Sequence, residues 1–129
     1  MILGIDYGIK KIGLALWDEE TKIATPWRIL ENKSSNVVLQ ELNKAMIDYK
    51  ISRIIVGEPL SSLSERTPQT EITEKFIAFL RKNFSIPIET QDEFFTTKEA
   101  RTIVRETGQK KRAVDAHAAA VILQAYLDK

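Results

Sequence analysis

The sequence predicts an α/β fold in a single domain, residues 1–129, with a mixed five-stranded sheet flanked by about four helices. Short apolar segments separated by turn residues fill the first quarter of the chain, which is typical of an antiparallel meander. Beyond them, segments with helical spacing of apolar residues alternate with short apolar runs, which is typical of parallel strands joined by helices. With 43% hydrophobic residues, the chain can bury one core.

Three apolar runs, separated by turns, predict the first three strands. Residues 2–5, 12–17 and 23–30 are the three runs, and the turns lie over residues 8–11 and 18–21. Because each turn is short, consecutive strands should pair antiparallel.

The next elements are a helix and a buried strand. Ser34 and Ser35 can cap a helix that carries Val38, Leu42 and Met46 at helical spacing. The continuous apolar run over 54–56 predicts a central strand. Residues 57–68 contain two prolines and three serines without an apolar period, which predicts a long loop, and loops of that length are often functional.

The last third predicts one more strand and three helices. A second helix covers residues 72–80, and a fifth strand begins at Pro87. Thr96 and Glu99 form a capping box for a third helix. The last helix covers residues 114–127.

Composition excludes several classes of protein. The chain has no cysteine, which excludes disulfides and thiolate metal sites and fits a reducing compartment. The first residues lack the basic and long apolar segments of a signal peptide or membrane span, so we expect a cytoplasmic protein with no membrane partner. The net charge of +1 argues against a uniformly basic nucleic-acid binder but leaves local patches open.

Asp6 is the first candidate for a functional residue. It lies at the end of the apolar run that contains Leu3 and Ile5, and Gly8 follows closely. A carboxylate in a buried strand is costly without a partner, and a cation is the simplest one. Alternatively, Asp6 only opens the turn, because aspartate and glycine both favour turns.

Four segments of the chain resemble the successive motifs of the YqgF/RuvX family within the ribonuclease H-like superfamily. They are GIDYGIKKIGLALWD, RIIVGEPL, DEFFTTKEA and AVDAHAAAVILQAYL, and they occur in the family's order and with compatible spacing. The resemblance covers essentially the whole chain and implies a ribonuclease H-like domain. The order of predicted elements agrees with that fold.

The resemblance implies a metal-dependent nuclease. Such enzymes gather acidic side chains around Mg²⁺ or Mn²⁺, and the matching catalytic and metal-binding residues here are Asp6, Glu93 and Asp115. Asp92 is an alternative to Glu93. Asp115 is expected in the first turn of the last helix, so it could instead serve only as a partner of the helix dipole. The small residues Ala118 and Ala119 favour close approach of that helix to the sheet.

The chain departs from the family pattern at two positions. Phe94 stands where an arginine is common, so a cation near the scissile phosphate is missing; Arg66, Lys98 or Arg101 could replace it, or activity could be weakened. Glu58 stands where an apolar residue is usual, and related resolvases carry a catalytic glutamate near the end of this strand. The alternative is a solvated loop acid.

Basic residues cluster between positions 98 and 112, where six of them accompany two acidic residues. The cluster lies on the third helix and just before the last one, and it predicts a surface that contacts phosphates. The alternative is a solvated helix face. The predicted nucleic-acid-binding residues are Lys98, Arg101, Arg105, Lys110, Lys111 and Arg112.

The resemblance favours a nuclease that processes the 5′ end of pre-16S rRNA, with RNA and ribosomal precursor particles as partners. The alternatives are a Holliday junction resolvase acting on DNA in recombination and repair, and a non-catalytic nucleic-acid-binding module. A resolvase benefits from a two-fold dimer. The helices show no spare apolar face, so we expect a monomer.

Overall fold

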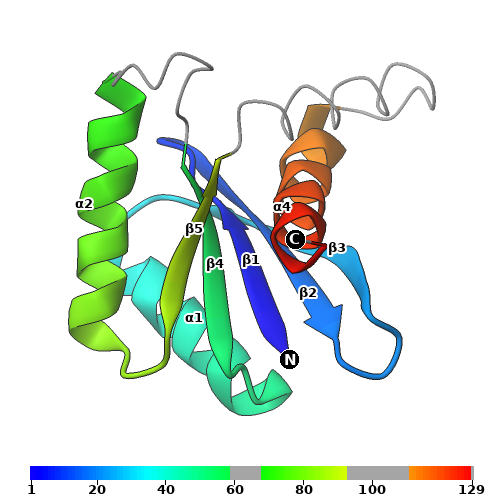
Figure 1. Cartoon of the computed structure of the whole chain (residues 1–129). Helices are drawn as coiled ribbons and strands as arrows, with labels where there is room; N and C mark the ends of the chain where they lie inside the picture. Colours follow the sequence, from blue (N-terminus) through cyan, green and yellow to red (C-terminus); the bar gives the residue numbers. More distant parts are fainter. Residues whose placement is uncertain (59–67, 93–110, 129) are drawn as a thin grey trace.

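A five-stranded sheet forms the middle layer of the molecule, with helices on both faces (Figure 1). The computed structural model describes residues 1–58, 68–92 and 111–128. None of the described helices has the length and apolar character needed to cross a lipid bilayer. The strands are β1 (Ile2–Asp6), β2 (Lys11–Asp18), β3 (Ile23–Glu31), β4 (Arg53–Glu58) and β5 (Ile88–Asp92), and the helices are α1 (Ser35–Tyr49), α2 (Pro68–Asn83) and α4 (Lys111–Leu127).

The sheet is mixed, as predicted, with the strand order β3-β2-β1-β4-β5. The pairs β1–β2 and β2–β3 are antiparallel, whereas β1–β4 and β4–β5 are parallel. Three of the four expected helices fall within the described residues. The predicted helix that begins near Thr96 and most of the predicted loop over 57–68 lie outside them.

Alternation of side chains along the strands creates a hydrophobic core on each face of the sheet. The core under α1 and α2 includes Leu3, Ile5, Ile54 and Val56 from the central strands. The core under α4 is smaller and contains small side chains, so α4 lies close to the sheet. Its fully or largely buried members are Ile2, Ala15, Ile55, Ala119, Ala120, Ile122 and Leu123.

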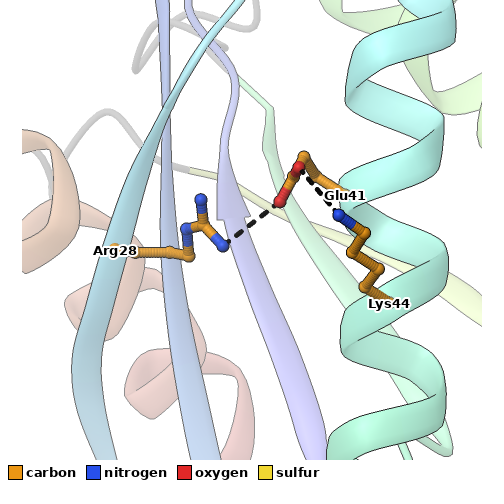
Figure 2. A network of polar contacts seen from close by, with 3 residues as sticks. All are labelled: Arg28, Glu41 and Lys44. Carbon is orange, nitrogen blue, oxygen red and sulfur yellow. Dashed lines mark ion pairs between the residues drawn. The ribbon is translucent and has the colours of Figure 1, made fainter.

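The edge strand β3 is bent and tied to α1. Its register with β2 shifts between Leu14 and Ala15, and Pro26 lies beside the shift, where an edge strand tolerates proline. Arg28 of β3 and Lys44 of α1 approach the carboxylate of Glu41 at 3.2 and 3.7 Å (Figure 2). These groups are exposed or partly exposed, so each pair contributes only about 0–1 kcal/mol, and the Arg28–Glu41 pair is the one that links β3 to α1.

Both ends of α1 are capped, and the N-cap confirms the predicted start of the helix. Ser34 is the N-cap, and its hydroxyl accepts a hydrogen bond from the Val37 backbone nitrogen at 3.2 Å. Lys50 ends the helix in the left-handed conformation (φ 50°), and its backbone N–H donates a hydrogen bond to the Met46 carbonyl. The chain then turns back to start β4 beside β1.

Candidate functional site

Acidic residues end all three parallel strands at one edge of the sheet. Asp6 is the last residue of β1, Glu58 of β4 and Asp92 of β5. The register pairs Ile5 with Val56 and Glu58 with Asp92. The carboxyl ends of parallel strands are where α/β sheets bind ligands, so this edge is the candidate site.

Glycines flank Asp6 on both neighbouring strands. Asp6 pairs with Gly13 of β2, and extending the β1–β4 register by one residue brings Gly57 of β4 beside it. Gly57 in turn pairs with Gln91 of β5. We call Gly13, Asp6, Gly57 and Gln91 the Asp6 row. Because its two glycines lack side chains, the sheet leaves room beside the Asp6 carboxylate for a ligand.

Asp6 lies on the face of the sheet that α4 covers. A Cβ atom on Gly4 would lie 2.9 Å from the Leu123 Cβ and 3.0 Å from the Ala119 carbonyl oxygen, so α4 packs directly on Gly4. Side chains two positions apart in a strand share a face, which places Asp6 on the same side as Gly4.

Helix α4 runs antiparallel to β1, so its beginning lies at the site edge (Figure 1). Near its other end, the side-chain oxygen of Gln124 accepts a hydrogen bond from the Ala24 backbone nitrogen at 3.0 Å. Ala24 pairs with Trp17, which pairs with Ile2 at the start of β1. The first residues of α4 therefore lie toward the end of β1.

This packing brings the backbone of Asp115 toward Asp6. Asp115 precedes Ala119 by one helical turn, about 6 Å along the axis, and Asp6 follows Gly4 by a similar distance along the strand. The expectation that Asp115 lies in the first turn was wrong, because α4 begins at Lys111 and Asp115 is its fifth residue. The helix dipole acts mainly within the first turn, so the dipole explanation of Asp115 loses force.

The turn that follows Asp6 is held by contacts that sequence reasoning did not find. Asn32, just beyond β3, donates from its amide nitrogen to the Tyr7 hydroxyl at 3.0 Å and to the Gly8 carbonyl at 2.9 Å. The Tyr7 ring stacks on Phe76 of α2 with centroids 4.2 Å apart. A Cβ atom on Gly8 would collide with the Lys11 carbonyl, so the turn requires glycine. These contacts fix the end of β1 and therefore Asp6.

The sequence model of one protein family, described as "RuvX: Holliday junction resolvase", matches residues 1–129. The chain belongs to the RuvX family. Relatives from Rickettsia africae (strain ESF-5) and Rickettsia felis (strain ATCC VR-1525 / URRWXCal2) are 36% and 35% identical to it over 131 aligned positions, and both are named "Putative pre-16S rRNA nuclease". Each alignment covers 98% of this chain and 85% of the relative. These relationships make the chain a nuclease, a hydrolase of phosphodiester bonds.

Solved structures share the fold of this RuvX-family chain at low sequence identity. Thermus thermophilus RuvC matches with a TM-score of 0.60 and 13% identity, covering 98% of this chain and 95% of that one. The yeast mitochondrial Holliday junction resolvase Ydc2 matches with a TM-score of 0.56 and 12% identity, covering 98% and 77%. The ribonuclease H-like fold predicted from the sequence is confirmed.

The site residues predicted for this RuvX-family chain fall into two groups. Asp6 lies in β1, whereas Asp115, Lys111 and Arg112 lie in α4. Lys111 and Arg112 were expected just before the last helix, but α4 starts three residues earlier than predicted and includes them; two basic residues carry no apolar period that could mark this start. The other predicted residues lie outside the described part of the chain: Glu93, Lys98, Arg101, Arg105 and Lys110.

The described part of the site fits a hard divalent cation. All candidate donors at the edge are oxygens, the atoms that Mg²⁺ and Mn²⁺ prefer. The side-chain oxygen of Gln91, in the Asp6 row, is buried and has no hydrogen-bond partner. Among the described residues no three acidic or histidine side chains gather closely enough to hold a metal, and the predicted ligand Glu93 is not among those residues.

A hollow of about 250 Å³ lies on the opposite face of the sheet, beside the turn that follows Asp6. It combines aromatic rings with one exposed lysine, and its lining residues are Tyr7, Ser35, Ile72, Lys75, Phe76 and Phe79. Rings and a cation are the groups that bind single-stranded nucleic acid without reading its sequence.

Proposed function

We propose that this single domain, residues 1–129, is a cytoplasmic, metal-dependent nuclease that processes the 5′ end of pre-16S rRNA during ribosome biogenesis. The observation that supports it most directly is the placement of Asp6 at the carboxyl edge of the parallel strands, between two glycines and on the face where α4 carries Asp115. The names of the Rickettsia relatives supply the substrate.

In this proposal Asp6, Glu93 and Asp115 hold Mg²⁺ or Mn²⁺. The chemistry that such an ion supplies is activation of water and stabilisation of the departing oxygen of a phosphodiester. Asp6 is fixed by its strand and by the braced turn after it, and Asp115 is carried by a helix packed on Gly4. Two rigid elements thus carry these two residues, so their backbones are in place before substrate binds.

The basic residues hold the RNA backbone in this proposal. Lys111 and Arg112 lie in the first turn of α4, where the helix dipole disfavours cations unless an anion binds beside them. A phosphate is such an anion. The proposal gives Lys98, Arg101, Arg105 and Lys110 the same role of contacting phosphates, and the hollow near Tyr7 and Lys75 offers a second contact for an unpaired strand.

The test is cleavage of three labelled substrates, with and without Mn²⁺: single-stranded RNA with a 5′ extension, duplex RNA and a four-way DNA junction. We expect metal-dependent cleavage, fastest on the unpaired RNA, by a chain that sediments as a monomer. The large apolar side chains exposed in the described residues are scattered over three parts of the fold and form no contiguous dimer face within that part of the chain: Ile9, Ile23, Val37, Ile47 and Tyr49.

The family description favours one alternative, a resolvase acting on DNA junctions. A stable dimer that makes paired symmetric nicks in the junction would establish that alternative. Metal-independent binding of nucleic acid without any cleavage would instead identify a non-catalytic module, a role consistent with phenylalanine at position 94.

The second metal ligand can be identified by comparing two glutamates. Glu93→Gln should weaken Mn²⁺ binding and cleavage at least tenfold, because loss of even an outer-shell metal contact typically costs ~10–100-fold. Glu58→Gln should change both by less than about threefold if Glu58 is a solvated acid. Isothermal titration and initial cleavage rates measure the two effects. The reverse ranking would assign the ligand to Glu58, and equal severe losses would assign it to both.

Reversing three basic residues tests the RNA surface. Changing Lys98, Arg101 and Arg105 to glutamate should weaken RNA binding for all sequences and lower the slope of log affinity against log salt by ~2, since each phosphate contact contributes roughly 0.7–0.9. Fluorescence anisotropy at several salt concentrations measures the slope. The control reverses Lys22, Lys50 and Lys82, three exposed lysines, and causes the same change in net charge. Equal slopes in the two variants would leave the predicted residues as a solvated helix face.

A further inference from the structure

Gln91 carries a buried polar atom that the fold does not satisfy. Its side-chain oxygen Oε1 is buried and accepts no hydrogen bond. Leaving such a group unpaired costs about 1–3 kcal/mol, so buried carbonyl oxygens in native proteins nearly always have a partner. A glutamine kept in this position needs an explanation outside the protein's own hydrogen bonds.

The position of Gln91 points to the candidate site. Gln91 is the fourth member of the Asp6 row, and Gly57 lies between it and Asp6. Ile88 belongs to the core under α1 and α2, so alternation along β5 places Gln91 on the other face, the one that α4 and Asp6 share. The only other unpaired buried side-chain atom found among the described residues is Trp17 Nε1, in the row of Ile2 at the opposite end of β1.

The spacing suits a shared ion. Two neighbouring strand separations put the Asp6 and Gln91 backbones about 10 Å apart. No side chain stands between them, because the intervening residue is Gly57. Because Asp6 and Gln91 share one face of the sheet, an ion held over Gly57 lies within reach of both side chains.

We propose that Gln91 supplies a further oxygen to the divalent ion that Asp6 binds, a role that rests on the metal-dependent function proposed above. A carbonyl oxygen is a hard donor that suits Mg²⁺ and Mn²⁺. Unlike another carboxylate, it adds no negative charge to a site where several acids already repel one another. Binding of the ion satisfies the orphaned oxygen, which explains why the fold retains it.

The experiment measures Mn²⁺ affinity by isothermal titration of the full chain, and thermal unfolding in EDTA. Gln91→Met keeps the length of the side chain but removes the oxygen. We expect its Mn²⁺ affinity to fall about tenfold, equivalent to ~1.4 kcal/mol. Its metal-free midpoint of unfolding should stay the same or rise, because the unsatisfied group is gone. Gln91→Glu restores an oxygen at this position. Its Mn²⁺ affinity should therefore exceed that of Gln91→Met and lie close to that of the wild type.

Thr90→Val is the matched control, because Thr90 lies on the same strand and the opposite face; its Mn²⁺ affinity should stay within twofold. Gln91→Leu serves in place of Gln91→Met if the latter does not fold. The proposal is overturned if loss of the oxygen changes affinity by less than twofold, or if the wild type binds no Mn²⁺. Gln91-dependent Mn²⁺ binding without cleavage of any substrate would support this inference while refuting the proposed function.

Discussion

Asp6→Asn is expected to reduce metal-dependent cleavage by more than about a hundredfold, because loss of even an outer-shell metal contact costs ~10–100-fold. Asp6 is flanked by Gly13 and Gly57, so neither adjacent position can supply a replacement carboxylate. In metal-free buffer the variant should be as stable as the wild type or more so, since crowded carboxylates repel one another. Initial cleavage rates in Mn²⁺ and urea unfolding in EDTA measure the two effects.

Asp18→Asn is the matched control. Asp18 also ends a strand, β2, and its carboxylate accepts a hydrogen bond from the Glu20 backbone nitrogen at 2.8 Å. Asparagine keeps that acceptor, and the residue lies at the opposite end of the sheet, so cleavage should be unchanged. A clear loss of metal-free stability in Asp6→Asn would make Asp6 a structural residue of the turn rather than a metal ligand.

Local patterns in the sequence were sufficient to predict most of the described elements. The apolar runs gave β1, β2, β3 and β4 to within two residues, and Ser34 is the N-cap of α1 as expected. Ala119 confirms the expectation that small residues let the last helix approach the sheet, since its carbonyl lies almost against Gly4. Each of these features depends on residues close together in the sequence, where propensity and periodicity act.

Features that depend on strand register could not be predicted in the same way. Asn32 braces Gly8 across 24 residues of chain, and no local pattern marks an asparagine for that role. Gln91 gains significance only because the parallel pairing places it in the Asp6 row. The start of α4 was misplaced because its first two residues are basic, so the apolar pattern begins only after them.

Gly4→Ala should both destabilise the fold and impair catalysis in the molecules that remain folded. The new methyl group would lie 2.9 Å from the Leu123 Cβ and 3.0 Å from the Ala119 carbonyl, and both belong to α4. Relief requires α4 to move away from the sheet, and such overpacking typically costs about 1–3 kcal/mol. Urea unfolding measures this loss of stability.

The same displacement reaches the site because α4 carries Asp115 one turn before Ala119. A shift of about 1 Å in a catalytic group can cost ~10²-fold, so cleavage per folded molecule should fall at least tenfold in Gly4→Ala. Ile5→Val is the control: it removes a methyl from the core on the other face, costs about 0.5–1.5 kcal/mol and leaves α4 in place. If both variants cleave at the wild-type rate per folded molecule, the position of α4 does not govern the chemistry and Asp115 loses its proposed role. If only Gly4→Ala is slow, the metal centre requires the close packing of α4 on β1, and glycine at position 4 is what allows that packing.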